Sequence, residues 1–157
     1  MRVTTVSPDA PEALEILDAY WRDILARYYG RTAGDADVWL AVRDYPSDDL
    51  APPTGLFLLA TDEHGPVGCA GLHWTDADVA ELRRVFVAPR GRGRGWARAL
   101  LDAAEREARA SGRSEITAEV RGDLVEAQAL YESHGYERVA PFSTSWHADV
   151  WLRKRLT

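Results

Sequence analysis

Apolar residues in the first third of the chain recur at helical spacing. Between Ala13 and Tyr28 they fall three or four positions apart, and Gly30 follows where a helix would end. This pattern predicts an amphipathic helix over residues 11–29. A second, shorter helix is predicted over residues 35–42, and the proline- and aspartate-rich residues 45–53 are predicted to form a loop.

The middle of the chain changes to the pattern of β-strands. Short apolar or alternating runs are separated by turn-forming residues, so we expect neighbouring strands to pair antiparallel. Within the third run, Leu82, Arg84 and Phe86 are predicted to share one face of the sheet, because successive side chains of a strand point to opposite faces. The predicted strands cover residues 55–61, 67–74 and 79–87, with turns at 62–65 and 75–78.

The second half alternates helices and strands. A helix is predicted over residues 96–111 with Gly112 as its stop, and another is predicted to run from an Asp123 cap, with Glu126 as capping-box partner, to Gly135. Strands are predicted over residues 114–121, 136–139 and 146–153. This order indicates an α/β (α+β) fold with helices packed on a mixed sheet, and we expect residues 1–157 to form a single domain.

Composition and charge exclude several classes of protein. The net charge of −6 argues against a general nucleic-acid binder, and Lys154 is the only lysine. No apolar run approaches the roughly 20 residues of a membrane-spanning helix, and the N-terminus lacks the apolar block of a signal peptide. With Cys69 as the only cysteine, no disulfide can form within the chain, so a cytoplasmic location is expected.

The segment from Val85 to Leu101 carries the clearest chemical signal. An expected strand leads into a glycine- and arginine-rich turn, which opens directly into an expected helix. Free amides at a helix N-terminus, with glycines that allow close backbone approach, favour a phosphate or pyrophosphate ligand. A P-loop would need a Gly-Lys-Ser/Thr ending, and a dinucleotide fingerprint would need a parallel first strand, so neither alternative fits.

This segment resembles the coenzyme A loop of the Gcn5-related N-acetyltransferase (GNAT) family, whose pattern is Arg/Gln-x-x-Gly-x-Gly/Ala. One register uses Arg90, Gly93 and Gly95, and the other uses Arg92, Gly95 and Ala97. The second is preferred, because the family's small residue and leucine pair then fall at residues 99–101. Residues 127–136 and 81–87 are also similar to family segments, and the resemblance covers roughly residues 55–140.

The resemblance implies the fold and the cofactor site. It implies a mostly antiparallel sheet of about six to seven strands with helices on both faces, and acetyl-CoA as co-substrate. The pyrophosphate would rest on loop amides, the pantetheine arm would pair with a strand that splays from its neighbour, and Leu124 stands where many relatives have an asparagine beside that arm. The implied cofactor-binding residues are Val85, Phe86, Val87, Arg92, Gly93, Arg94, Gly95, Trp96, Ala97 and Leu124.

The same resemblance assigns catalytic residues. Tyr131 is the expected proton donor to the departing thiolate, and Glu81 or an ordered water is the expected base for the amine. Acetyl transfer to a primary amine of a small molecule is therefore expected, such as an amino acid, a polyamine or an antibiotic-like metabolite. The alternatives are a cofactor-binding regulatory module without turnover, or acetylation of a protein amine.

The acceptor site is expected to be aromatic. The residues predicted to line it are Tyr28, Tyr29, Trp74 and Trp146, together with Tyr45. Aromatic rings of this kind favour a small cationic amine. No metal site is expected, because no His, Cys or Asp cluster has ligand spacing. We expect no nucleic-acid or membrane partner, and the assembly is left open between a monomer and a homodimer.

Overall fold

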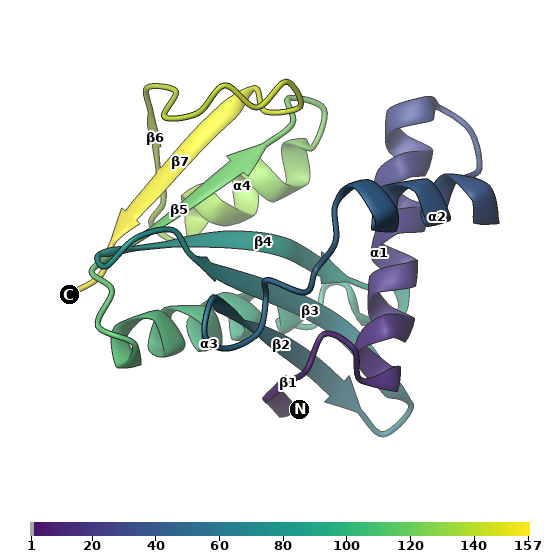
Figure 1. Ribbon diagram of the computed structural model, residues 1–157, viewed down its shortest axis with the longest axis horizontal. Coiled ribbons are helices and arrows are strands. Elements are labelled where there is room, and N and C mark those ends of the chain that lie inside the picture. Colours follow the sequence, from purple (N-terminus) through teal and green to yellow (C-terminus); the bar gives the residue numbers. More distant parts are fainter. Residues whose placement is uncertain (1) are drawn as a thin grey trace.

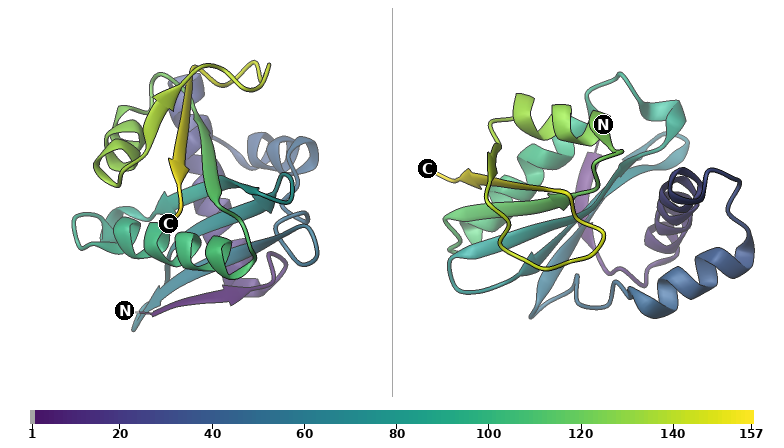
Figure 2. Two further views of the ribbon diagram at one scale, coloured as in Figure 1. Left: turned by 90° about the vertical axis from the view of Figure 1, so that its left-hand side faces the viewer. Right: turned by 90° about the horizontal axis from the view of Figure 1, so that it is seen from above.

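The chain folds around a mixed seven-stranded sheet that is covered by helices on both faces (Figures 1 and 2). The computed structural model describes residues 2–157, so Met1 lies outside the described residues. The strand order is β1-β2-β3-β4-β5-β7-β6, and every neighbouring pair is antiparallel except β4 and β5. The predicted mixed, mostly antiparallel sheet is confirmed.

Most helices and strands lie where the sequence predicts them. Residues 89–91 form one short 3-10 turn. The strands are β1 (Arg2–Val6), β2 (Gly55–Asp62), β3 (Gly65–Trp74), β4 (Val79–Val87), β5 (Glu115–Val120), β6 (Glu137–Val139) and β7 (Val150–Arg155). The helices are α1 (Pro11–Tyr29), α2 (Asp35–Asp44), α3 (Trp96–Ala110) and α4 (Val125–Ser133).

Three local predictions are wrong. The edge strand β1 was not predicted, because its five residues have too few apolar positions and it is defined by pairing with β2. The predicted strand 146–153 begins at Val150 instead, since Trp146 lies in a loop and is 68% exposed. Asp123 does not cap α4: Leu124 is the N-cap residue, and the Asp123 carboxylate accepts hydrogen bonds from Arg121.

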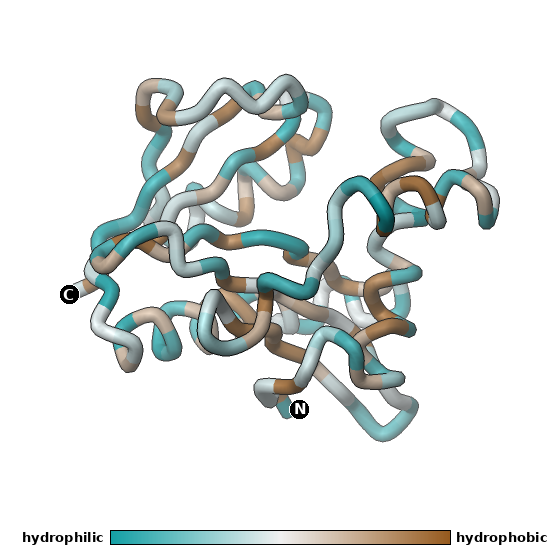
Figure 3. The backbone as a smooth tube through the Cα atoms, viewed as in Figure 1, coloured by the Kyte–Doolittle hydropathy of each residue, from teal (hydrophilic) through white to brown (hydrophobic). Residues whose placement is uncertain are grey.

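Two hydrophobic clusters hold the helices to opposite faces of the sheet. Beneath α3, Leu100 and Leu101 are fully buried, and each such leucine stabilises the fold by about 1.5–3 kcal/mol relative to exposure. Beneath α1, Ile16 and Leu17 pack on Phe57. Figure 3 shows hydrophobic stretches along the central strands and hydrophilic ones in many connecting loops. No helix within residues 2–157 is long and apolar enough to cross a membrane.

Strand β4 carries a bulge at Arg84. Its φ is +56°, and the register between β3 and β4 shifts between Cys69 and Gly71. Leu82 packs in the cluster beneath α3, whereas Phe86 packs in the cluster beneath α1. The prediction that Leu82, Arg84 and Phe86 share one face is therefore wrong, because the extra residue of the bulge reverses the alternation.

Strands β4 and β5 pair only over their first halves. Their parallel register runs from Val79 with Glu115 to Leu82 with Ala118 and then stops, while β5 stays paired with β7 up to Val120. Beyond Leu82 the two strands separate, so the edge of β4 from residue 83 onward has no strand partner on that side. This is the splay that the family resemblance implies.

A buried polar cluster ties the C-terminal strand to two helices. The Lys154 ammonium on β7 donates to a Glu105 carboxylate oxygen at 2.9 Å and to the His134 backbone carbonyl at 2.8 Å. Glu105 lies on α3 and is buried, and His134 follows α4. Because the buried carboxylate has a cationic partner, the cluster joins α3, α4 and β7 without leaving an unpaired charge.

Candidate active site

The loop before α3 presents free backbone amides. Gly93 and Gly95 have φ values of +76° and +86°, which favour glycine, and Gly95 is the N-cap residue of α3. Within residues 2–157, the amides of residues 93–98 donate to no acceptor, and the first amide bonded to the cap is that of Ala99. A turn of free amides at the positive end of a helix dipole fits an anion such as a pyrophosphate.

A groove of about 390 Å³ leads from this loop along the separated edge of β4. Its walls come from α1, β4 and α4. Six of the ten predicted cofactor residues line it: Val85, Phe86, Val87, Arg92, Ala97 and Leu124. The remaining predicted residues, Gly93, Arg94, Gly95 and Trp96, belong to the adjoining turn, and the Trp96 indole is buried beneath the loop, which leaves its amide as the available group.

Charged side chains lie across this groove. Arg92 folds back so that its Nε donates to the Val87 carbonyl at 3.0 Å, and its Nη2 lies 3.8 Å from Asp23. The Arg27 guanidinium on α1 donates to the Glu126 carboxylate on α4 at 3.0 Å. One carbonyl predicted to pair with a pantetheine arm therefore already has an internal partner, and the two helices are joined by an ion pair.

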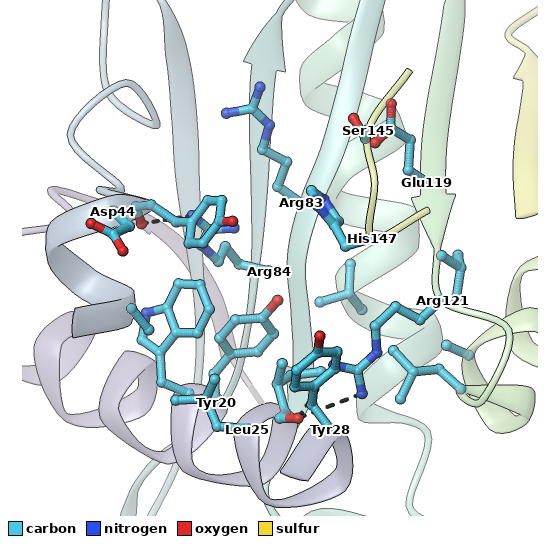
Figure 4. A pocket seen from close by; sticks show the side chains of 18 of the residues that line it. Tyr20, Leu25, Tyr28, Asp44, Arg83, Arg84, Glu119, Arg121, Ser145 and His147 are labelled. Carbon is cyan, nitrogen blue, oxygen red and sulfur yellow. Dashed lines mark hydrogen bonds between the residues drawn. The ribbon is translucent and has the colours of Figure 1, made fainter. Parts of the chain in front are cut away.

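The groove opens into a second cavity of about 990 Å³ between α1, α2, β4, β5 and the 140–149 loop (Figure 4). Two tyrosines stand at the junction, since Tyr20 and Tyr131 line both spaces. Tyr131 is 7% exposed, and burial raises the pKa of its phenol above 10.0, followed by a smaller effect of Tyr20. The remaining residues shared by the two spaces are Ile24, Val85, Leu124 and Ala127.

Tyr20 was missed by the sequence analysis, although a signal for it exists. It lies three residues after Leu17 and four before Ile24, on the helical stripe that faces the sheet. Burial raises the pKa of the Tyr20 phenol, and the nearby Arg84 guanidinium opposes that shift. Both junction phenols are therefore neutral at physiological pH and can donate a proton or a hydrogen bond.

Aromatic side chains form the outer part of the larger cavity. Tyr28, Tyr29, Tyr45 and Trp146 all line it, and the Tyr28 ring lies edge-on to Tyr29 at 5.3 Å and to Trp146 at 6.1 Å. Trp74 lies apart from this group. It lines neither space, and instead packs at the end of β3 beneath the Arg113 guanidinium, 4.5 Å from its ring centre.

Carboxylates and arginines form the floor of the same cavity. Glu81 lines it, but its carboxylate accepts a hydrogen bond from Arg83 at 2.6 Å, and Arg83 also donates to Asp49 at 2.8 Å. Glu119 on β5 also lines the cavity and forms no ion pair within residues 2–157. Thr117 pairs with Glu81, and Glu119 lies two positions further along β5, so Glu119 and Glu81 share one face of the sheet. Glu119 could therefore have been predicted from strand spacing.

Cys69 and His147 are held by packing and hydrogen-bond contacts that give neither of them an acidic partner. Cys69 is fully buried, its thiol donates to the Arg84 carbonyl at 3.1 Å, and burial raises its pKa above 9.0. His147 packs edge-on against Trp146 and Tyr45. Over the described part of the chain, no group of three or more His, Cys, Asp or Glu side chains is arranged to hold a metal ion.

Comparison with known proteins gives a consistent result. The model of the acetyltransferase (GNAT) family matches residues 18–136. A mycothiol acetyltransferase of Gordonia bronchialis is 41% identical over 91 residues, which cover 56% of this chain but only 29% of that relative. The match therefore spans less than a third of that relative's length.

Solved structures match over the whole chain. A GNAT-family acetyltransferase of Staphylococcus aureus Mu50 aligns with a TM-score of 0.78 at 17% identity, covering 99% of this chain and 100% of the other. An aminoglycoside 6′-N-acetyltransferase complexed with coenzyme A aligns with a TM-score of 0.69 at 19% identity, covering 100% and 98%. At these identities the structural likeness shows a shared fold.

Proposed function

Because the chain belongs to the acetyltransferase (GNAT) family, we propose that it is an acetyl-CoA-dependent N-acetyltransferase acting on a primary amine of a small molecule. The observation that carries this proposal is the junction of the two spaces. A groove that begins at a turn of free amides meets an aromatic cavity, and two neutral phenols stand where they meet. One ligand can thus approach from each side.

Acetyl-CoA fits the groove side. The amides of residues 93–98 would hold the pyrophosphate, and the unpaired edge of β4 at Val85 and Val87 would offer hydrogen bonds to the pantetheine arm. Arg92 would have to release the Val87 carbonyl for that pairing to be complete. Leu124 lines both spaces and offers packing in place of an amide side chain.

The residues at the junction fit acetyl transfer. Bound acetyl-CoA would supply an activated thioester there. Tyr131 would donate its phenol proton at the sulfur, since its raised pKa keeps it protonated until the thiolate leaves. The acceptor amine must lose a proton, and Glu81 is the proposed acceptor of that proton through water, because Arg83 already occupies one of its carboxylate oxygens.

A small acceptor is favoured over a protein amine by the form of the larger cavity. It is walled on several sides by α1, α2 and the loop that carries Trp146, and it holds aromatic rings that attract cations. The names of two similar proteins contain a small molecule, mycothiol in one and an aminoglycoside in the other. The only cysteine, Cys69, is a free and buried thiol, which supports a cytoplasmic location.

A coupled pair of assays tests the proposal. Acetyl-CoA should raise the melting temperature in proportion to the logarithm of its concentration above Kd, as expected for a ligand of the native state. Thiol release from acetyl-CoA should then depend on an amine chosen from amino acids, spermidine and an aminoglycoside. A thermal shift without amine-dependent thiol release would favour a regulatory module. Absence of both would contradict the proposal.

A further inference from the structure

Two consecutive arginines project into the larger cavity because of the bulge in β4. Arg83 and Arg84 both line it, and Figure 4 shows both side chains near β4 in the cavity. In a regular strand, one of them would lie on the face beneath α3. The bulge therefore places a second guanidinium on the acceptor side of the sheet, beside residue 85 at the junction.

The two guanidinium groups differ in their partners. Arg83 is neutralised by Glu81 at 2.6 Å and by Asp49 at 2.8 Å. Arg84 donates to the Tyr45 carbonyl at 3.0 Å and to the Ser47 hydroxyl at 3.3 Å, both of which are neutral. Among residues 2–157, no carboxylate lies within ion-pair distance of Arg84.

Two features of Arg84 lower the stability of the fold: the partial burial of its charge and its left-handed backbone conformation. Its guanidinium lies 4.8 Å from the Trp21 ring centre and 5.9 Å from that of Tyr20, so it is partly removed from water. Its left-handed backbone costs on the order of 1 kcal/mol or more in a residue with a side chain. A half-buried cation without a counter-ion favours an anionic ligand.

Other charges in the cavity limit the anion to one negative charge. Arg121 is already held by both oxygens of Asp123, at 2.9 and 3.0 Å. Asp44 and Asp48 also line the cavity, and their carboxylates would repel a dianion such as a phosphate more strongly than a monoanion. A carboxylate carries a single charge and accepts the planar hydrogen bonds of a guanidinium.

We propose that the acceptor is an α-amino acid whose carboxylate binds Arg84. This rests on the proposed acetyltransferase function. The Arg84 guanidinium lies 5.9 Å from the ring centre of Tyr20, which lines both spaces, so a carboxylate bound to it would hold the adjacent α-amine near the junction. The amino-acid side chain then faces the rings of Tyr28, Tyr45 and Trp146.

The chemical step follows from this placement. The α-nitrogen forms a bond to the acetyl carbon as the carbon–sulfur bond breaks. The nitrogen loses one proton to water or Glu81, and the sulfur gains one from Tyr131, which is then reprotonated by solvent. The products are an N-acetyl amino acid and coenzyme A, without any oxidation or reduction.

Pairs of substrates that differ only in the carboxylate test the proposal. Thiol release is measured with the standard L-amino acids and with their carboxamides. We expect kcat/KM to be about 10- to 100-fold higher for the best acid than for its amide, the range for a hydrogen bond to a charged group. The intrinsic reactivity works in the opposite direction, because the amide has the less basic amine and more of it is neutral.

Variants locate the effect. Arg84→Gln should reduce the acid-to-amide ratio to near one, Arg84→Lys should restore part of it, and Arg43→Gln on the outer side of α2 should leave it unchanged. If Arg84→Gln fails to fold, the acid-to-amide ratio of kcat/KM in the unaltered protein still tests whether the acceptor's carboxylate is recognised. Equal rates for acids and amides, an unchanged ratio in folded Arg84→Gln, or no rate with any amino acid would overturn the inference. Acetylation of spermidine or an aminoglycoside in those cases would leave the transferase proposal standing.

Discussion

The sharpest prediction concerns the hydroxyl of Tyr131. The change Tyr131→Phe keeps the ring, which packs in the cluster beneath α3 and lies 5.7 Å from the Tyr136 ring. Within residues 2–157 the hydroxyl has no hydrogen-bond partner, so its removal should cost less than about 1 kcal/mol of folding free energy. The binding of acetyl-CoA should change by no more than a few-fold.

Turnover should respond far more strongly. If the phenol protonates the leaving thiolate, its loss should lower kcat by about 10²–10⁴, the usual contribution of a general acid. That corresponds to about 3–5 kcal/mol of barrier. Thiol release can be followed with a thiol reagent in the folded protein, because Cys69 is fully buried and does not contribute.

A neighbouring tyrosine supplies the control. Tyr136→Phe removes a hydroxyl from a ring that touches Tyr131 but lines neither space, so kcat should be unchanged. Near-normal turnover of Tyr131→Phe would reduce Tyr131 to a packing residue. Equal losses in both variants would show that the effect comes from the shared packing rather than from proton transfer. Loss of acetyl-CoA binding would make the hydroxyl a binding contact.

Four further measurements check the site and the fold. Gly95→Asp should abolish the thermal shift by acetyl-CoA, whereas Gly112→Asp, at a similar φ of +87° beyond α3, should carry the same strain and keep the shift. Gly91→Ala should destabilise the fold by about 1–3 kcal/mol in urea unfolding, because the new Cβ would clash with Val67 Cγ2. The Cys69 thiol should react with a thiol reagent only after unfolding, since burial raises its pKa, and rapid labelling of the native protein would contradict this. Retention on heparin should be weak at physiological salt, and steep salt-dependent binding would reveal a polyanion site.

The turn that is proposed to hold the cofactor could be predicted from sequence because its signals are local. The sequence predicts a helix directly after Gly93 and Gly95. In the structure, both glycines have the positive φ values that such a turn needs. Tyr131 was assigned from the family resemblance of residues 127–136, and it lines both spaces at their junction. These predictions depend on residues a few positions apart, where the backbone geometry of a strand, turn or helix fixes what lies together.

The acceptor half depends on contacts that no local pattern records. The bulge at Arg84 arises where β3 and β4 shift register, and no turn residue marks it in the sequence. Trp74 and Trp146 looked alike as aromatic candidates, but only Trp146 lies on the loop beside α1. The pairing of Glu81 with Arg83, which limits Glu81 as a base, is an exception, because side chains two positions apart on a strand share one face.

The clustering of Lys154 with Glu105 and His134 has a consequence for the protein's own chemical durability. A thioester acylates any accessible amine, so a protein that keeps acetyl-CoA bound is exposed to slow modification of its lysines. This chain has a single lysine, and its nitrogen is engaged by two oxygen acceptors at 2.9 and 2.8 Å. Every other side chain among the lysines and arginines is an arginine, whose guanidinium group is a poor nucleophile. The fold is thereby protected from self-acetylation, and its intact mass should not gain a lysine acetyl group during long incubation with acetyl-CoA.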